Sequence, residues 1–392
     1  MKKTIRDMDI KGKRVLMRVD FNVPLYESGR IVDDTRIREA LPTIKYVLQA
    51  PAKVVLMSHL GRPKGEVKPK MSLAPCAKRL SKLLGRNVKM LKDCVGPEVE
   101  SVIGNMKDGE AVLLENLRFH KGETKNDPEF AGALAKLGDV FISDAFGTCH
   151  RAHASTEGVT KFLPSAMGFL IEKEINYFDK ILHSPEKPFA LILGGAKVSD
   201  KIAVIENMFK KIDCLLIGGA MAYTFLKSRL KGIGNSRLEE DKISVASDIF
   251  TKARDSGVSI FLPEDHVIAR SITANTLVRV AREHIPDGWI GLDIGPRTIK
   301  KFKGALKNAK TIVWNGPLGY FELKPFRKGT AEIAKFVSRL NATTIIGGGD
   351  TAAAIKELRL GKRMSHISTG GGASLEYLEG KRLPGIAALQ DK

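Results

Sequence analysis

The segment FLIEKEINYFDKILH (residues 169–183) divides the sequence into two halves and decides how the chain is organised. Its apolar residues from Ile171 to Leu182 are spaced as on one face of an α-helix, with charged residues between them. The next residues, HSPEKP (183–188), end that helix, because a residue that precedes proline avoids the helical conformation. We therefore expect a charged helix that joins two domains. A surface helix within one large domain is the alternative.

On both sides of this segment, short and nearly continuous apolar runs precede helical patterns. Such runs are typical of parallel strands covered on both faces, and their alternation with helices predicts βαβ units. At 392 residues the chain has room for two or three domains. We expect an α/β fold with two doubly wound, Rossmann-like parallel-sheet domains. The predicted strands are Arg14–Val19, Lys53–Met57, Ala111–Glu115, Asp139–Ser143, Phe189–Leu193, Asp213–Ile217, Val258–Leu262, Thr311–Trp314 and Thr343–Ile346. The predicted helices include Leu73–Leu84, Pro128–Leu137, Asp200–Lys211, Asp241–Ser256, Phe326–Leu340 and Thr351–Leu360.

Basic residues exceed acidic residues by a wide margin, since 64 Lys and Arg against 44 Asp and Glu give a net charge of +20. This excess attracts anions such as nucleic acid, an acidic membrane or phosphorylated metabolites. The four cysteines are far apart and form no disulfide or zinc-binding pattern. No apolar run approaches the length of a membrane span, and the N-terminus lacks the apolar core of a signal peptide. We expect a cytoplasmic protein without a membrane partner.

In the N-terminal half, arginine and histidine follow the predicted strand ends. The segments are RVDFNVP (18–24), SHLGRP (58–63), ENLRFH (115–120) and DAFGTCHRAH (144–153), and DDTR (33–36) opens the next predicted helix. Ligands of open α/β sheets bind at the carboxyl ends of the strands. One such arginine alone would be an ordinary solvated residue. Five convergent segments instead indicate a multiply charged anion, because arginine matches carboxylate and phosphate oxygens with paired donors.

In the C-terminal half, the predicted strand ends are rich in glycine. The clusters are GGAKVSDK (194–201), GGA (218–220), NGPLG (315–319), GGGDT (347–351) and GGG (370–372). A single cluster would be a tight turn, but five at successive strand ends indicate phosphate binding by backbone amides. Lys197 and Lys201 are spaced to reach one polyphosphate, and Asp350 could hold a nucleotide-bound Mg²⁺.

No covalent catalyst is evident in these loops. Neither G-x-x-x-x-G-K-[ST] nor G-x-G-x-x-G occurs in them, and no G-x-S-x-G appears in the chain. Direct in-line phosphoryl transfer between two bound ligands needs only positioning and positive charge. The two halves together supply both.

The motifs resemble those of the phosphoglycerate kinase family, in the family's order and from about residue 4 to the C-terminus. The matching motifs are RVDFNVP (18–24), DDTRIREALPTI (33–44), MSHLGRPKG (57–65), ENLRFHKGE (115–123), DAFGTCHRAHAS (144–155), GGAKVSDKI (194–202), DGWIGLDIGP (287–296), WNGPLGYFE (314–322), GGGDT (347–351) and STGGGASLEYLEG (368–380). The resemblance implies a glycolytic and gluconeogenic kinase. Its reaction would be reversible, Mg²⁺-dependent transfer of a phosphoryl group from 1,3-bisphosphoglycerate to ADP, giving 3-phosphoglycerate and ATP.

The resemblance also implies roles for individual residues. The residues expected to bind the phosphoglycerate are Asp20, Phe21, Asn22, Arg36, His59, Leu60, Gly61, Arg62, Arg118 and Arg151. Those expected to bind the nucleotide are Lys197, Lys201, Gly219, Gly291, Asn315, Glu322, Gly348, Gly349, Asp350 and Thr351, with Asp350 as the Mg²⁺ ligand. Those expected to stabilise the transferring group are Arg36, Lys197, Gly371 and Gly372. Two roles stay open for His59 and His150: acid/base catalysis, or simple hydrogen bonding without catalysis.

The implied architecture is two domains with a cleft that closes by hinge bending. We expect a phosphoglycerate-binding domain at residues 1–168, the linking helix at 169–185 and a nucleotide-binding domain at 186–379. The tail, about 380–392, is expected to pack back on the first domain. We expect a monomer and no dedicated nucleic-acid partner.

The sequence departs from the family pattern at Ala220, at Cys149 and in the segment 269–277, which lacks acidic residues. The last of these leaves the nucleotide preference open. Two other function classes stay as alternatives. A nicotinamide-dependent dehydrogenase would use the same sheet type but lacks its glycine fingerprint, and a nucleic-acid binding protein is motivated only by the net charge.

Overall fold

The strand β1 (Arg14–Val19) lies near the centre of a six-stranded, wholly parallel sheet. It pairs with β2 (Lys53–Met57) on one side and with β5 (Val140–Asp144) on the other. The strands β3 (Val88–Met90), β4 (Ala111–Leu113) and β6 (Ser165–Met167) complete the order β3-β4-β2-β1-β5-β6. Strands β2, β3 and β4 all lie on one side of β1, and the chain then crosses to β5 on the other side, so the switch point of this sheet lies between β1 and β5.

The alternation of side chains in β1 explains how this sheet is covered. Val15, Met17 and Val19 belong to a core shared with helices α1 (Thr35–Gln49) and α2 (Ala74–Leu84). Successive side chains of a strand point to opposite faces, so Leu16 and Arg18 project to the other face, where both are wholly buried. The other helices of this part are α3 (Pro97–Gly104), α4 (Lys121–Thr124), α5 (Pro128–Ala135) and α14 (Pro384–Ala387).

A second six-stranded parallel sheet is built around β7 (Phe189–Leu193) and β13 (Thr311–Asn315), which pair with each other. Its order is β15-β14-β13-β7-β8-β9, so its switch point lies between β7 and β13. The remaining strands are β8 (Cys214–Ile217), β9 (Ser259–Phe261), β14 (Thr343–Gly347) and β15 (His366–Ile367). The helices are α7 (Ile202–Met208), α8 (Met221–Ser228), α9 (Ile243–Asp255), α10 (Pro296–Leu306), α11 (Lys328–Val337), α12 (Gly349–Glu357) and α13 (Gly372–Leu378).

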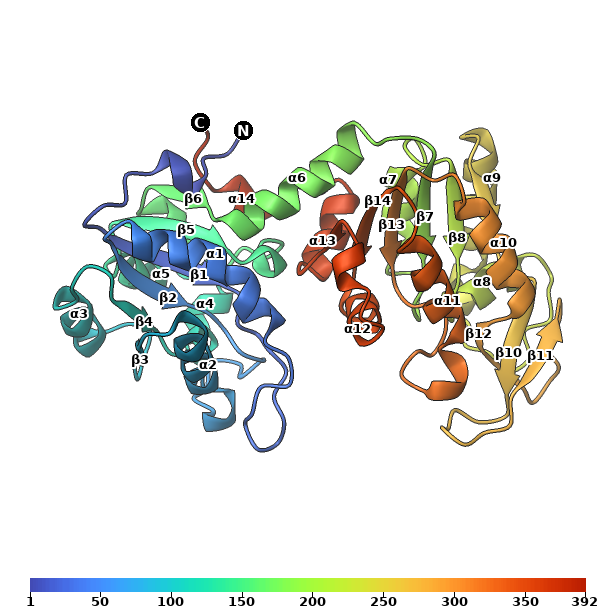
Figure 1. Ribbon diagram of the computed structural model, residues 1–392, viewed down its shortest axis with the longest axis horizontal. Helices are drawn as coiled ribbons and strands as arrows, with labels where there is room; N and C mark the ends of the chain where they lie inside the picture. Colours follow the sequence, from blue (N-terminus) through green and yellow to red (C-terminus); the bar gives the residue numbers. More distant parts are fainter. The chain divides into compact units, whose positions relative to one another are not determined.

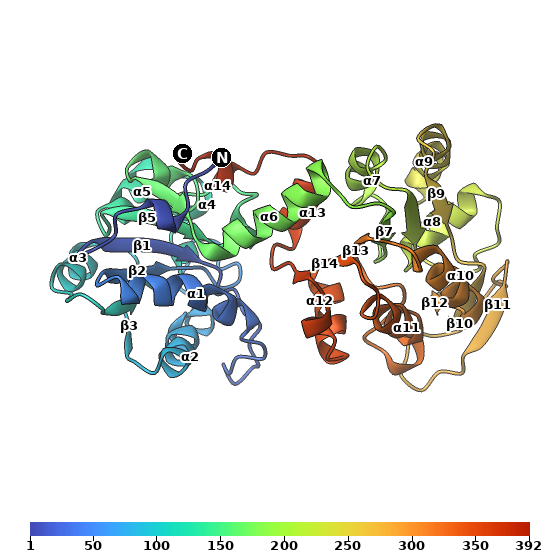
Figure 2. The same cartoon turned by 45° about the horizontal axis from the view of Figure 1, so that its top comes forward.

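The computed structural model describes all 392 residues and divides them into two units. The first contains Met1–Asn176 and Arg382–Lys392, and the second contains Tyr177–Lys381. Helix α6 (Phe169–His183) runs from one into the other and ends two residues before the predicted end of the linking helix at 185 (Figure 1). The two chain termini lie side by side in the first unit, as both views show (Figures 1 and 2).

The predicted α/β class with two parallel sheets is confirmed. The structure adds a small antiparallel sheet in the second unit that the sequence analysis did not predict, with the order β11-β10-β12. Its strands are β10 (Asp265–Ala269), β11 (Arg279–Arg282) and β12 (Ile290–Ile294). The predicted helix Asp200–Lys211 is shorter than expected, because residues 198–201 turn before α7 begins. No helix is both long and apolar enough to cross a lipid bilayer.

Candidate active site

The loop that follows β1 joins several predicted residues at the switch point of the first sheet. The Arg36 guanidinium, at the start of α1, donates to the Asp20 carboxylate, which is almost wholly buried. The Asn22 side-chain oxygen accepts a hydrogen bond from the amide of Gly61 at 2.9 Å. The loop after β1 is therefore tied both to α1 and to the loop after β2.

Three of the predicted arginines line one cavity of about 590 Å³. Arg62 follows β2, Arg118 lies in the short helical turn after β4, and Arg151 follows β5, so three strand ends contribute. The complete lining is Arg62, Lys64, Gly65, Arg118, Lys121, Thr124, Lys125, Arg151 and His153. It contains no carboxylate, and this matches the requirements of a small, multiply charged anion.

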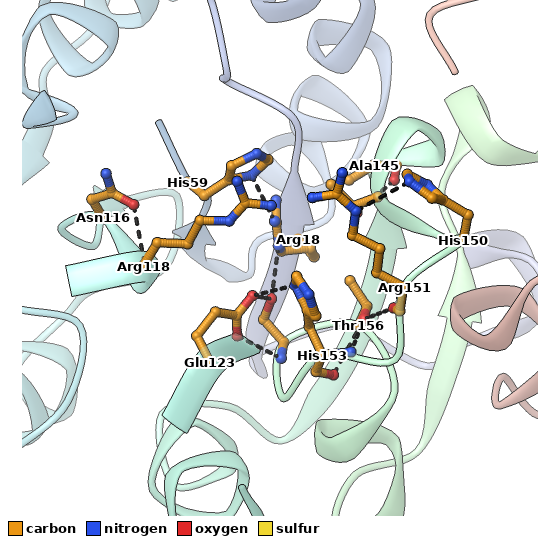
Figure 3. A network of polar contacts seen from close by, with 12 residues as sticks. Arg18, His59, Asn116, Arg118, Glu123, Ala145, His150, Arg151, His153 and Thr156 are labelled. Atoms are coloured by element: carbon orange, nitrogen blue, oxygen red, sulfur yellow. Dashed lines mark hydrogen bonds and ion pairs between the residues drawn. The ribbon is translucent and has the colours of Figure 1, made fainter. Parts of the chain in front are cut away.

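Arg118 is held rigidly at the wall of this cavity. Its amide donates to the Asn116 side-chain oxygen at 3.1 Å (Figure 3). One guanidinium nitrogen donates to the Gly61 carbonyl at 2.8 Å. Its Nε is buried and has no partner within the protein. Burial, with the nearby charges of Arg18 and Arg151, lowers the pKa of Arg118 to about 10. An anion would supply both the missing acceptor and the missing negative charge.

The two histidines of the motifs are neutral at physiological pH. Burial lowers the pKa of His59 well below its usual value, and the charges of Arg18, Arg118, Arg36 and Arg151 act in the same direction. Burial also lowers the pKa of His150 to about 4, helped by Arg151. The Arg151 guanidinium donates to Nε2 of His150 at 3.1 Å. These contacts favour hydrogen bonding over acid/base catalysis for both histidines.

A buried polar network lies beside the cavity. Arg18 was counted among the convergent arginines of the first half, but it is wholly buried and does not line the cavity, whereas Glu123 and Ser155 had no predicted role. Glu123 and Ser155 are wholly buried, and the Ser155 hydroxyl donates to the Glu123 carboxylate at 2.7 Å. The Arg18 guanidinium donates to the Ser155 hydroxyl at 2.9 Å (Figure 3). Arg18, Glu123 and Ser155 all stand inside the quoted motifs, but nothing in the sequence indicated that they meet.

Two predicted substrate-binding residues have their side chains in the core. Phe21 is 0% and Leu60 4% exposed, and both pack in the hydrophobic cluster of the first sheet. Any contact that they make with a ligand must therefore come from the backbone. Gly61 has a positive φ of 65°, which a side chain would strain, so the backbone at this position is shaped for a close approach.

In the second unit, the glycine loops after β7, β8 and β13 pack against one another at the switch point. A Cβ on Gly194 would lie 2.1 Å from the Pro317 carbonyl oxygen, and one on Gly219 would lie 2.5 Å from the Gly195 amide nitrogen. Any side chain there would therefore force backbone to move. The glycines are needed for loop-to-loop packing, and this packing also leaves a surface of bare peptide groups.

The two predicted lysines occupy different positions. Lys201 is 9% exposed, and its ammonium donates to the Asn315 side-chain oxygen at 2.6 Å. Burial lowers the pKa of Lys201. Lys197 is exposed in the loop after β7. The structure thus fixes Lys201 against the end of β13 and leaves Lys197 accessible to a ligand.

In the GGGDT loop (347–351), one buried residue fixes the loop in place and two others are exposed to solvent. Thr351 is wholly buried, and its hydroxyl accepts a hydrogen bond from the Gly316 amide at 2.7 Å. Gly349 and Asp350 open helix α12 and are exposed. Gly348 has a positive φ of 82° and lies beside the Asn315 amide group. Thr351 therefore holds the loop, whereas Asp350 and the free amides face solvent.

The other predicted site residues of the second unit are two nucleotide-binding residues, Gly291 and Glu322, and the glycines Gly371 and Gly372 that were predicted to stabilise the transferring group. Gly291 is buried in β12, where a Cβ would lie 2.1 Å from the Tyr223 hydroxyl. Glu322 is exposed after β13. Gly371 has a positive φ of 55° and precedes α13, which begins at Gly372. A Cβ on Gly371 would meet no atom within 4 Å, so this turn is open to a ligand.

The fold also brings Cys94 beside Asp93 and His120, with potential ligand atoms within 4.8 Å of one another. His120 Nε2 already pairs with Asp93 at 2.6 Å. Burial and the nearby carboxylates raise the pKa of the Cys94 thiol well above its usual value, so it stays protonated. We assign no metal to this group.

Comparison with known proteins gives one consistent result. A family model described as phosphoglycerate kinase matches residues 5–381. The chain is 54% identical to a phosphoglycerate kinase of Moorella thermoacetica and 55% identical to one of Pelotomaculum thermopropionicum, with 100% of both chains covered in each pair. The chain belongs to the phosphoglycerate kinase family.

Solved structures of the family agree with this fold. A phosphoglycerate kinase from Coxiella burnetii aligns with a TM-score of 0.89 at 39% identity, over 99% of this chain and 98% of that chain. One from Pyrococcus horikoshii aligns with a TM-score of 0.86 at 32% identity, over the same shares. The predicted resemblance to phosphoglycerate kinases is confirmed, and with it the class of glycolytic phosphotransferase. The dehydrogenase alternative is wrong.

Proposed function

We propose that this chain catalyses reversible phosphoryl transfer between 1,3-bisphosphoglycerate and ADP, giving 3-phosphoglycerate and ATP. The observation that carries the proposal is the convergence of Arg62, Arg118 and Arg151 on one cavity without a carboxylate. Three guanidinium groups in one small cavity repel each other, so the arrangement is explained by an anionic ligand that joins them. Membership of the family supplies the identity of that anion.

In this proposal, the first unit holds the phosphoglycerate. Arg62, Arg118 and Arg151 bind its phosphate, because they surround the cavity. Asp20 and Asn22 orient the hydroxyl and the loop, and His59 also contacts the phosphoglycerate. Arg36 extends from α1 beside Asp20, where its charge can act on the transferring group.

The second unit would hold the nucleotide on its glycine loops. Lys201, positioned by Asn315, and the accessible Lys197 would balance the phosphate charge. The exposed Asp350 carboxylate at the start of α12 suits Mg²⁺, which prefers a carboxylate oxygen together with phosphate oxygens and water. Bound there with the nucleotide, Mg²⁺ would neutralise part of the phosphate charge. Gly219, Gly291 and Glu322 would contact the rest of the nucleotide.

Transfer would then need no covalent intermediate and no general base. In either direction the attacking oxygen belongs to an anion, the carboxylate of 3-phosphoglycerate or the terminal phosphate of ADP, so no proton has to be removed. The chain's task is to align the two oxygens and to stabilise the charge on the PO₃ group between them. Arg36, Lys197 and the amides at Gly371 and Gly372 are the groups that we assign to this stabilisation.

We further propose that the two bound substrates meet through hinge closure, that the protein acts as a monomer and that it is cytoplasmic. The four unpaired cysteines support a reducing compartment. Small-angle scattering with and without the ligand pair tests closure. Identical curves would contradict it.

A coupled assay tests the reaction. Folded protein with ADP, Mg²⁺ and 1,3-bisphosphoglycerate should form ATP, and the variant Arg118→Met should lose most of the turnover while it keeps its fold. Absence of turnover by the folded wild-type protein would reject the proposal.

A further inference from the structure

A wholly buried carboxylate lies behind the cationic cavity. Glu123 is 0% exposed, and both of its oxygens accept hydrogen bonds from Ser155, one from the amide at 3.0 Å and one from the hydroxyl at 2.7 Å. Its Oε1 also lies 3.6 Å from Nδ1 of His153. Although burial opposes the charge, His153, Arg18 and Ser155 lower the pKa of Glu123 below its usual value. Glu123 therefore stays ionised in the interior.

A chain of hydrogen bonds leads from this carboxylate to His59. Because the Ser155 hydroxyl donates to Glu123, its oxygen is free to accept from Nε of Arg18 at 2.9 Å. Arg18 then contacts Nδ1 of His59 at 3.0 Å through a terminal nitrogen (Figure 3). Its other terminal nitrogen donates to the Val19 carbonyl at 2.5 Å. The guanidinium is thus held on three sides.

The contact between Arg18 and His59 defines the proton position on the imidazole. A guanidinium has donors only, so Nδ1 of His59 must be the acceptor. Nδ1 therefore carries no proton, and a neutral ring must carry its proton on Nε2. The Arg18 contact occupies Nδ1 and leaves Nε2 of His59 as the ring nitrogen available to a ligand.

We propose that Glu123 acts as a positioning residue which, through Ser155 and Arg18, holds His59 in the tautomer that presents Nε2–H to the bound phosphoglycerate. The tautomer follows from the contacts alone, whereas its use on the substrate rests on the proposed function. The negative charge of Glu123 stabilises Arg18 in the interior, because it compensates the positive charge of a wholly buried guanidinium. Ser155 gives that interaction a direction, because its oxygen accepts from only one guanidinium nitrogen.

Nitrogen NMR of the free protein tests the tautomer without any assay of activity. In ¹⁵N-histidine-labelled wild-type protein at neutral pH, the His59 signals, assigned with His59→Gln, should show an unprotonated Nδ1 and a protonated Nε2. Ser155→Ala breaks the chain with little change in volume, and Glu123→Gln removes the charge. In each variant, the ¹⁵N signals of His59 should move toward values that indicate a mixture of the Nδ1–H and Nε2–H tautomers. Glu129→Gln, an exposed acid on α5, serves as the control and should leave the signals unchanged.

Kinetics separate the positioning role from a general loss of fold. Ser155→Ala should raise the KM for 3-phosphoglycerate about tenfold, as expected for one weakened hydrogen bond to a charged group, with the KM for nucleotide unchanged. A His59 tautomer that stays pure Nε2–H in both Ser155→Ala and Glu123→Gln would overturn the proposal. Lack of kinase turnover in the wild-type protein would reject the proposed function instead, and the tautomer result would stand by itself.

Discussion

At the scale of single residues, the site depends on charges that are compensated from within the protein. Asp20 accepts from Arg36, and Glu123 compensates Arg18, so two of the cations have an acid beside them. Arg62, Arg118 and Arg151 line a cavity without an acid. Arg62, Arg118 and Arg151 therefore carry charge that an anionic ligand can neutralise, whereas Arg18 and Arg36 are already oriented by an acid before a ligand binds.

Arg36→Ala should reduce kcat far more than it raises the KM for nucleotide. If Arg36 acts mainly on the transition state, the barrier should rise by about 2–4 kcal/mol, which corresponds to a loss of roughly 30- to 1000-fold in kcat. Steady-state kinetics measure this. Arg38→Ala is the matched control, because Arg38 lies on the same helix but pairs with Asp34 at the surface. An unchanged kcat in Arg36→Ala would remove Arg36 from that role.

Gly194→Ala should damage the glycine loops of the second unit. The new Cβ would lie 2.1 Å from the Pro317 carbonyl oxygen, and backbone cannot yield as a flexible side chain can. We expect a loss of about 1–3 kcal/mol in the free energy of unfolding and weaker ADP binding. Urea unfolding and calorimetric titration with ADP measure the two effects.

Gly304→Ala is the control for this substitution. Gly304 lies within α10, and a Cβ there would meet no atom within 4 Å. Alanine should stabilise that helix by about 0.5–1 kcal/mol. Equal stability of the two alanine variants would show that the loop packing does not require glycine.

At the scale of elements, buried carboxylates at or near the ends of two strands accept hydrogen bonds from backbone amides in the first turn of a helix. Asp144, the last residue of β5, accepts from the Leu170 amide at 2.9 Å in the first turn of α6. Asp293, in β12, accepts from the Gly329 amide at 2.7 Å in the first turn of α11. Burial raises the pKa of each carboxyl to about 7, although these amides favour the charged form. One atom of Asp144, Oδ2, has no hydrogen-bond partner.

The raised pKa of Asp144 makes stability depend on pH. A carboxyl whose pKa is higher in the folded than in the unfolded state binds its proton more tightly when folded, so stability falls as pH rises from about 4 to about 7. The slope is on the order of 1.4 kcal/mol per pH unit for one group. Asp144→Asn removes this contribution. The free energy of unfolding of the variant, compared with that of the wild-type protein, should therefore be more favourable at pH 8 than at pH 4.5.

Urea unfolding of both proteins at these two pH values measures the difference. Asp127→Asn, at a half-exposed cap of α5, should show no comparable gain. The same stability difference between Asp144→Asn and wild type at both pH values would contradict the assignment.

At the scale of the whole molecule, the end of the chain completes the first unit. Residues Arg382–Lys392 belong to it, and the Lys3 amide donates to the Gln390 carbonyl at 2.9 Å. The Gly385 amide donates to the Cys149 carbonyl, close to His150 and Arg151. Leu383, Ile386 and Leu389 are at most 9% exposed. Folding of the first unit therefore needs residues from both ends of the chain.

Leu389→Ala should destabilise the first unit by about 2–5 kcal/mol, because it leaves a cavity under the tail. Both tryptophans, Trp289 and Trp314, lie in the second unit, so their fluorescence reports only on that part. On heating, the circular dichroism transition should begin earlier in the variant, with the fluorescence transition unchanged. Leu230→Ala, at a side chain that is 92% exposed, should change neither. A shift of the fluorescence transition alone would contradict this division of the chain.

Local pattern was enough to predict much of the architecture. The bounds of β1, β2 and β7 match the predicted ones residue for residue, because each is a nearly continuous apolar run. The strands β3, β6 and β15, of two or three residues each, were missed. In the small antiparallel sheet, β11 is mostly exposed, so no apolar run marks it.

The sequence by itself determined the fold class, the family and the segments that carry the chemistry, because side-chain periodicity and the position of a strand end are local properties. Only the tertiary structure decided which of these residues meet. Ser155 and Arg18 are 137 positions apart, Arg18 and His59 are 41 apart, and Lys201 and Asn315 are 114 apart. A hydrogen bond between such residues exists only after the sheet of their own unit has formed, and burial then sets which groups keep their charge. The roles of the individual site residues stay predictions, which the variants above can test.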